Sequence, residues 1–72
     1  MLKINKLKGK IVENGKTISD VAEAVGIDRA TMYRRLAENG ETFTVREVSA
    51  IAKCLHLTVD DVNDIFFGDF VA

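Results

Sequence analysis

Four polar residues that can begin a helix divide this chain into short segments. Thr17, Asp28, Thr44 and Thr58 each stand immediately before a run of apolar residues at helical spacing, and Ser, Thr, Asp and Asn are the side chains preferred at a helix N-cap. Thr44 opens Thr-Val-Arg-Glu, a complete capping box, and Thr17 opens the similar Thr-Ile-Ser-Asp. The four residues follow one another closely, so each helix has room for only a few turns.

Apolar residues at intervals of three and four along these segments predict five helices around one core. The expected segments cover about residues 2–14, 17–25, 29–38, 44–55 and 58–66. Gly9 lies inside the first segment and weakens it by about 1 kcal/mol relative to alanine, which leaves the start of that helix undefined. No alternation of apolar and polar residues indicates a strand. We therefore expect an all-α fold, a compact five-helix bundle that forms one domain over residues 1–72.

The composition excludes several classes of protein. A chain of 72 residues is one small domain, and it has no apolar run near the roughly 18 residues of a membrane span. The single cysteine, Cys54, excludes an internal disulfide and a multi-thiolate zinc site, and we expect it in the core. We expect a cytoplasmic protein without a cofactor, membrane partner or small-molecule substrate.

No catalytic or metal-binding set of side chains stands out either. Asp60, Asp61 and Asp64 lack the ligand spacing of a calcium loop. So short a chain rarely builds both a core and a water-excluding pocket, and we therefore expect no enzyme and no catalytic residue.

Charge is distributed unevenly along the chain despite a formal net charge of −1. Residues 1–35 hold eight Lys and Arg against four Asp and Glu, a charge of +4, whereas residues 36–72 hold two against seven, a charge of −5. A molecule with this charge polarity can bind a polyanion through one face while the other face points away from it. The alternative is a set of ordinary solvated faces that happen to be sorted in this way.

The second and third segments are joined by a very short turn. The second ends at Val25, and only Gly26-Ile27-Asp28 separates it from the third. A glycine-containing turn of three residues between two short helices is the helix-turn-helix arrangement. Gly26 can adopt a positive φ at the corner. Ala22 is small where the helices must approach closely, and Met32 can pack back onto the second segment.

On Val21-Ala22, Gly26-Ile27 and Met32, the chain resembles the phage Cro and repressor type of helix-turn-helix transcription regulator. The resemblance extends over about residues 2–67, and the ending Asp64-Ile65-Phe66-Phe67 also looks like small regulators of phages that infect Gram-positive bacteria. It implies sequence-specific binding of double-stranded DNA, with the third segment in the major groove. It also implies either a stand-alone Cro-type regulator or the isolated N-terminal domain of a repressor, located in a bacterial host cell and associated with the nucleoid when bound.

Two positions depart from the pattern of that family. Ile18 stands where the second helix usually begins with a glutamine that anchors a DNA phosphate. The substitute contact is expected from one of three neighbours: Lys16, Thr17 or Ser19. Arg35 stands three residues after Met32, where the family favours an apolar side chain, and Leu36 can take over that packing.

With Met32 and Leu36 turned inward, Ala30, Arg34 and Ala37 point outward, and Arg29 begins the third segment on its flank. The resemblance assigns base recognition to this part of the segment. The residues implied are Arg29, Ala30 and Arg34. An arginine can hold guanine O6 and N7 through two hydrogen bonds, and an alanine can touch a thymine methyl group. The candidates for phosphate or flanking contacts are Lys16, Thr17, Ser19, Thr31, Tyr33, Arg35, Asn39 and Thr42. The alternatives are a solvated helix face for Arg34 and Arg35 and a half-buried core position for Tyr33.

Residues 65–72 form an apolar tail that holds three of the four phenylalanines. Phe66 is expected to cap the core, whereas Phe67, Phe70 and Val71 are candidates for a self-complementary patch in a homodimer. Such a dimer places two recognition helices about 34 Å apart on a pseudo-palindromic operator. Two alternatives remain: a tail folded onto its own core, and a protein-interaction module on the same scaffold, anti-repressor or antitoxin-like, with little DNA binding.

Overall fold

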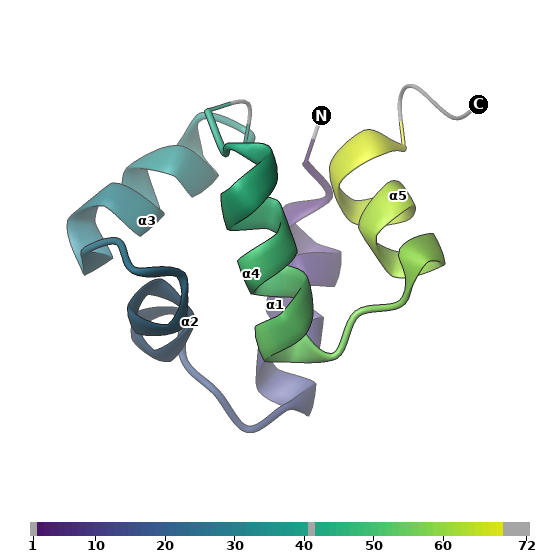
Figure 1. Cartoon of the computed structure of the whole chain (residues 1–72), viewed down its shortest axis with the longest axis horizontal. Helices are drawn as coiled ribbons and strands as arrows, with labels where there is room; N and C mark the ends of the chain where they lie inside the picture. Colours follow the sequence, from purple (N-terminus) through teal and green to yellow (C-terminus); the bar gives the residue numbers. More distant parts are fainter. Residues whose placement is uncertain (1, 41, 69–72) are drawn as a thin grey trace.

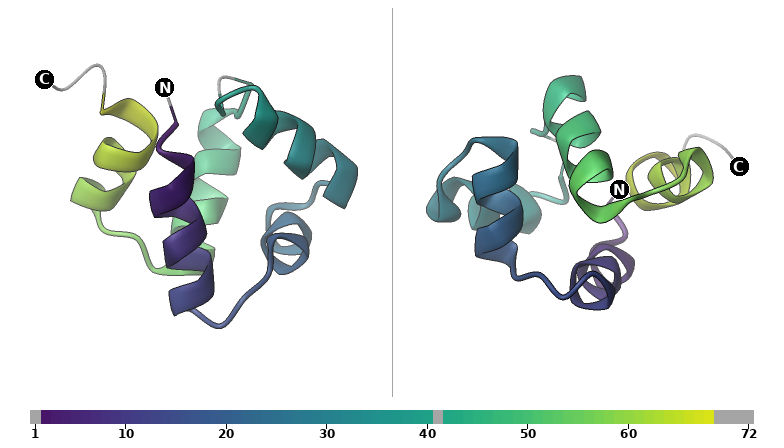
Figure 2. Two further views of the ribbon diagram at one scale, coloured as in Figure 1. Left: turned by 180° about the vertical axis from the view of Figure 1, so that it is seen from behind. Right: turned by 60° about the horizontal axis from the view of Figure 1, so that its bottom comes forward.

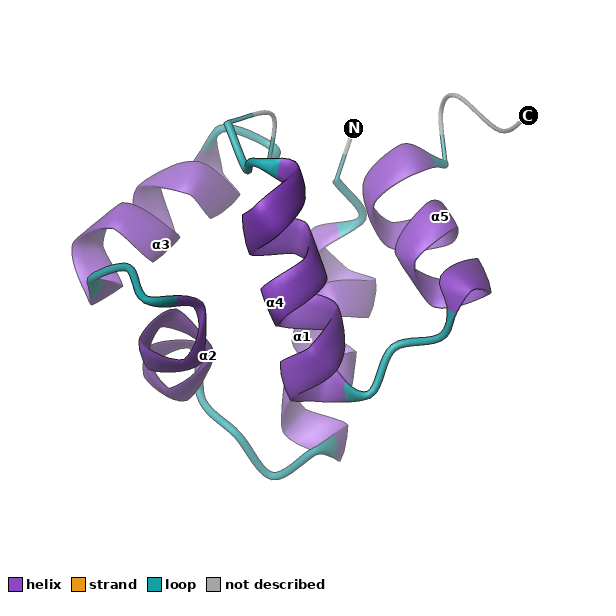
Figure 3. Cartoon of the chain, in the orientation of Figure 1, coloured by secondary structure: helices purple, strands orange, loops and turns teal. Residues whose placement is uncertain are grey.

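Five helices follow one another in residues 2–40 and 42–68, the part of the chain that the computed structural model describes (Figure 1). They are α1 (Ile4–Glu13), α2 (Ile18–Val25), α3 (Arg29–Ala37), α4 (Val45–Leu55) and α5 (Val59–Phe67). Loops and turns connect them, and these residues contain no strand (Figure 3). The prediction of an all-α fold with five short helices is confirmed.

The predicted helix starts are confirmed by their hydrogen bonds. The side chains of Thr17, Thr44 and Thr58 each accept the N–H of the residue three positions later, and the carboxylate of that residue accepts the N–H of the threonine in return. Each of the three is therefore a complete capping box. The threonine N–H bond lowers the pKa of the three carboxyls concerned, which belong to Asp20, Glu47 and Asp61.

The first helix begins at Ile4, two residues later than the sequence predicted. Leu2 and Lys3 precede the helix, and their N–H groups donate to carbonyls that are distant in the sequence. The Leu2 N–H donates to Asn39 O at 3.1 Å, and the Lys3 N–H donates to Ile65 O at 2.9 Å. The Leu2 side chain is buried. Residues 2–3, here called the N-terminal strap, thus join the loop after α3 to the last turns of α5.

The core lies around α4, which occupies the centre of the molecule (Figure 1). In that view α2 and α3 lie on one side of α4, α5 lies on the other, and α1 lies behind it; the view from behind shows α1 in front of α4 (Figure 2). The side chain of Ile51, in the middle of α4, is 0% exposed. Phe66 is buried and Cys54 is partly buried against the core, as expected.

The basic half of the sequence does not form one basic face. Lys3 and Lys6 both form ion pairs with Asp64 of α5, and Lys10 lies 3.8 Å from the Asp61 carboxylate. The packing of α1 against α5 brings these opposite charges together. The charge polarity along the chain is therefore partly neutralised where α1 packs against α5.

The two lysines lower the pKa of Asp64 from its ordinary 3.8 to about 2. A carboxyl whose pKa is depressed on folding stabilises the fold above its ordinary pKa, and this contribution is lost as the pH falls through the depressed value. We therefore expect Asp64→Asn to be less stable than the wild type at pH 7, with the difference narrowing from about pH 4 to pH 2. Urea unfolding at several pH values measures this difference. A difference in unfolding free energy that stays constant over that pH range would contradict the pairing of Asp64 with the two lysines.

Candidate nucleic-acid interface

The turn between α2 and α3 is set by Gly26. This residue ends α2 in the left-handed conformation, with φ 88°, which glycine adopts without steric cost. Its N–H donates to Ala22 O at 2.9 Å, and the N–H of Ile27 donates to the same oxygen at 3.1 Å. Asp28 then caps α3 by accepting the Thr31 N–H at 2.6 Å. α3 therefore leaves the turn in a direction fixed by both helix ends.

One face of α3 is buried and the opposite face is exposed. Met32 and Leu36 are buried, as the sequence predicted, whereas Ala30 and Arg34 are exposed on the opposite side of the helix. Arg29 is exposed at the first position of the helix. Figure 1 shows α3 on the outside of the molecule, with α2 beside it. The three residues that the resemblance assigned to base recognition thus lie together on an accessible helix surface.

The two exposed arginines have different surroundings. The Arg29 guanidinium lies over the ring of Tyr33, with 5.7 Å between its central carbon and the ring centroid. The Arg34 side chain is 66% exposed, and its Nε lies 3.7 Å from a carboxylate oxygen of Glu38. An exposed pair one helical turn apart is weak, so Arg34 is available to another partner. Tyr33 is itself exposed rather than half-buried in the core.

Arg35 points elsewhere. Its side chain is only 19% exposed and forms an ion pair with Glu47, which is 14% exposed. The guanidinium also lies over the ring of Phe43, at 5.9 Å from the centroid. The structure therefore places Arg35 between α3 and the start of α4, whereas Arg29 and Arg34 are exposed.

The start of α2 brings together the candidates for phosphate binding. Lys16 and Ser19 are partly exposed, whereas the Thr17 hydroxyl accepts the Asp20 N–H at 3.1 Å. The Asp20 carboxylate lies at the same helix end, where its hydrogen bond from the Thr17 N–H lowers its pKa and keeps it charged. Ile18 packs against the core. This end of α2 therefore combines donors with one negative charge.

The remaining candidates lie beside or after α3. Thr31 is partly buried in the first turn, and its N–H is used by the Asp28 cap. Asn39 and Thr42 are exposed in the loop that leads to α4. The backbone of Asn39 adopts a positive φ of 61°, and its carbonyl accepts the N–H of Leu2. Phe67 is exposed on α5, whereas Phe70 and Val71 lie outside the described residues.

Comparison with protein families agrees with this geometry. The family described as the Cro/C1-type HTH DNA-binding domain matches residues 6–67 of the chain. The chain belongs to the Cro/C1-type helix-turn-helix family. The match covers the turn, the exposed face of α3 and all five helices except the first two residues of α1. Searches of curated proteins and of solved structures find no match.

Sequence reasoning about this Cro/C1-type domain missed the partners of Arg35. The sequence indicates for Glu47 only a place in a capping box, and it indicates no role for Phe43. The available signal was the presence of Arg35 at a position where the family favours an apolar side chain. The structure accommodates the arginine there because an aromatic ring lies against its guanidinium and a carboxylate neutralises its charge.

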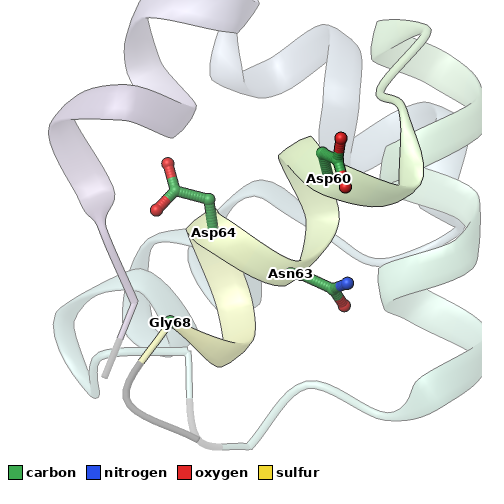
Figure 4. Close-up of a pocket in the computed structure, with 4 residues that line it drawn as sticks. All are labelled: Asp60, Asn63, Asp64 and Gly68. Carbon is green, nitrogen blue, oxygen red and sulfur yellow. The ribbon is translucent and has the colours of Figure 1, made fainter. Parts of the chain in front are cut away.

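The domain also has a pocket of about 260 Å³ on α5, on the opposite side of α4 from the helix-turn-helix. Asp60, Asn63, Asp64 and Gly68 line it, and Asp64 points from it toward α1 (Figure 4). Its two carboxylates make it unsuited to a phosphate. Within residues 2–40 and 42–68, no helix has the length and apolar character to cross a membrane. The same residues bring no three His, Cys, Asp or Glu side chains together as a metal site.

Proposed function

We propose that the chain is a small transcriptional regulator, of phage or prophage type, that binds double-stranded DNA sequence-specifically. The observation that carries the proposal is the exposure of Arg29 and Arg34 on α3, the helix that directly follows the helix-turn-helix corner. A helix presented in this way enters the major groove with its N-terminal residues against the base edges. The Cro/C1-type family match supports DNA binding as the general activity.

In this proposal Arg29 and Arg34 read guanines, and Ala30 lies against a thymine methyl group. Bidentate arginine–guanine contacts each contribute about 1–3 kcal/mol of discrimination. The stacking of Arg29 on Tyr33 supports its role, because the ring restricts the orientations that the guanidinium samples. Lys16 and Ser19 at the start of α2, and Asn39 and Thr42 after α3, bind the flanking phosphates.

We further propose that the protein binds a pseudo-palindromic operator as a homodimer. The support is Phe67, a large apolar side chain exposed on α5 beside the buried Phe66, with ring centroids 6.4 Å apart. Two-fold dimers commonly cover such apolar surface. In a dimer of this kind the half-site centres lie about one turn of DNA, 34 Å, apart.

Selection of sites from a random duplex library with the purified protein tests these proposals. We expect enrichment of a guanine-containing inverted repeat with half-sites one turn apart, and binding that weakens steeply as the salt concentration rises. Enrichment of a single half-site would retain the DNA-binding function and remove the dimer. Weak, salt-sensitive retention without enrichment would overturn sequence-specific regulation and favour a protein-interaction module.

A further inference from the structure

Arg35 is the one arginine of α3 that the proposed DNA contacts do not use. Its guanidinium is held on one side by the Glu47 carboxylate and on the other by the ring of Phe43. The Phe43 ring meets Phe66 of α5 edge to face, with centroids 6.3 Å apart and an interplanar angle of 89°. Arg35 is therefore seated on side chains that themselves belong to the packed interior.

The partner of Arg35 is itself fixed in place. The Glu47 carboxylate accepts the Thr44 N–H at 2.9 Å, and the Thr44 hydroxyl accepts the Glu47 N–H at 3.1 Å. A carboxylate held by its own helix start has little freedom to follow the arginine. The ion pair thus connects α3 to a rigid point, the first turn of α4.

This connection matters because α3 packs mainly against α2. The packing of Met32 and Leu36 fixes the buried face of α3, and the Arg35–Glu47 pair adds a second attachment near its C-terminal end. α3 has nine residues and is therefore about 13 Å long at 1.5 Å per residue, so a tilt of about 10° displaces one end by about 2 Å. Hydrogen bonds to base edges do not survive such a displacement.

We propose that Arg35 is a positioning residue: paired with Glu47, it holds the tilt of α3 at the value that lets Arg29 and Arg34 reach base edges together. Arg35 then contributes to discrimination between sequences and makes no phosphate contact. The inference rests on the proposed function, because it concerns how the same helix reads DNA.

The double variant Arg35→Met/Glu47→Gln tests this role. Methionine keeps an apolar side chain against Phe43, and glutamine retains the capping box, which accepts either Glu or Gln at this position. No carboxylate is left without its cation. Binding to the selected site and to a scrambled duplex is measured between 50 and 200 mM salt. Circular dichroism melting first establishes that each variant is folded at the assay temperature. If the double variant is unfolded, the same binding measurements are made with the single variant Glu47→Gln.

The two possible roles of Arg35 give different readouts. For a positioning residue we expect the ratio of selected-site to scrambled affinity to fall about tenfold, with an unchanged slope of log affinity against log salt. Lys16→Met is the matched control for loss of a phosphate contact. It should reduce that slope by about 0.9 and leave the ratio unchanged.

Three outcomes would overturn the inference. A slope reduced by about 0.9 with an unchanged ratio would make Arg35 a phosphate contact. A folded double variant with wild-type ratio and slope would limit the pair to stability. In these two cases the proposed function still holds if the wild-type protein binds the selected site more tightly than the scrambled duplex. A wild type that does not discriminate between the duplexes would overturn the proposed function and this inference together.

Discussion

Replacing Arg34 with alanine is expected to lower affinity for the selected DNA site by about 5- to 150-fold, equivalent to about 1–3 kcal/mol, and to remove the preference at one base pair. The arginine is exposed on the outer face of α3, and its only ion-pair partner among the described residues is Glu38, which lies 3.7 Å away and forms a weak pair. Loss of the guanidinium therefore changes DNA contacts while Met32 and Leu36 keep the helix in place. Site selection repeated with the variant measures both effects.

Lys53→Ala is the control for the loss of one positive charge. Lys53 is exposed in the last turn of α4 and has no assigned DNA contact. This variant should bind within about twofold of the wild type and select the same sequence, since a single distant charge is screened at moderate salt. If Arg34→Ala retains the full sequence preference of the wild type, Arg34 does not read a base.

The second large effect is expected from Ile51→Ala, which should reduce the free energy of unfolding by about 2–5 kcal/mol. The Ile51 side chain is 0% exposed at the centre of α4, where its removal leaves a cavity. A domain of 72 residues has a total free energy of unfolding of about 4–11 kcal/mol. The substitution therefore removes a large part of the stability, and urea unfolding with an unchanged m-value measures the loss.

Val45→Ala provides the matched control on the same helix. The Val45 side chain is 82% exposed at the first position of α4, so its truncation removes little buried surface. Its effect should stay within about 0.5 kcal/mol. Equal losses for the two variants would show that α4 is not the centre of the core.

The helices could be predicted largely because their starts are encoded locally. A capping box needs only residues three positions apart, so Thr44 and Glu47 carry their signal in four consecutive residues. The start of α1 could not be predicted in this way. It depends on the N–H groups of Leu2 and Lys3 finding carbonyls of Asn39 and Ile65, which are far away in the sequence.

The candidate interface likewise contains features that follow from local sequence patterns and features that depend on distant contacts. Helical periodicity predicted that Met32 and Leu36 face inward, and the exposure of Arg34 on the opposite side follows from it. The turning of Arg35 toward Glu47 depends on how the loop after α3 places the start of α4, which periodicity does not describe. The charge imbalance between the two halves also gave no indication that Lys3 and Lys6 pair with Asp64.

The N-terminal strap has a consequence for the order in which the domain folds. Each capping box closes a loop of a few residues and can form as soon as its own helix does. The strap joins residues more than half the chain apart, so its hydrogen bonds carry a larger loop-closure entropy. We therefore expect the helices and their turn to assemble first, and residues 2–3 to form their hydrogen bonds with the loop after α3 and the end of α5 last.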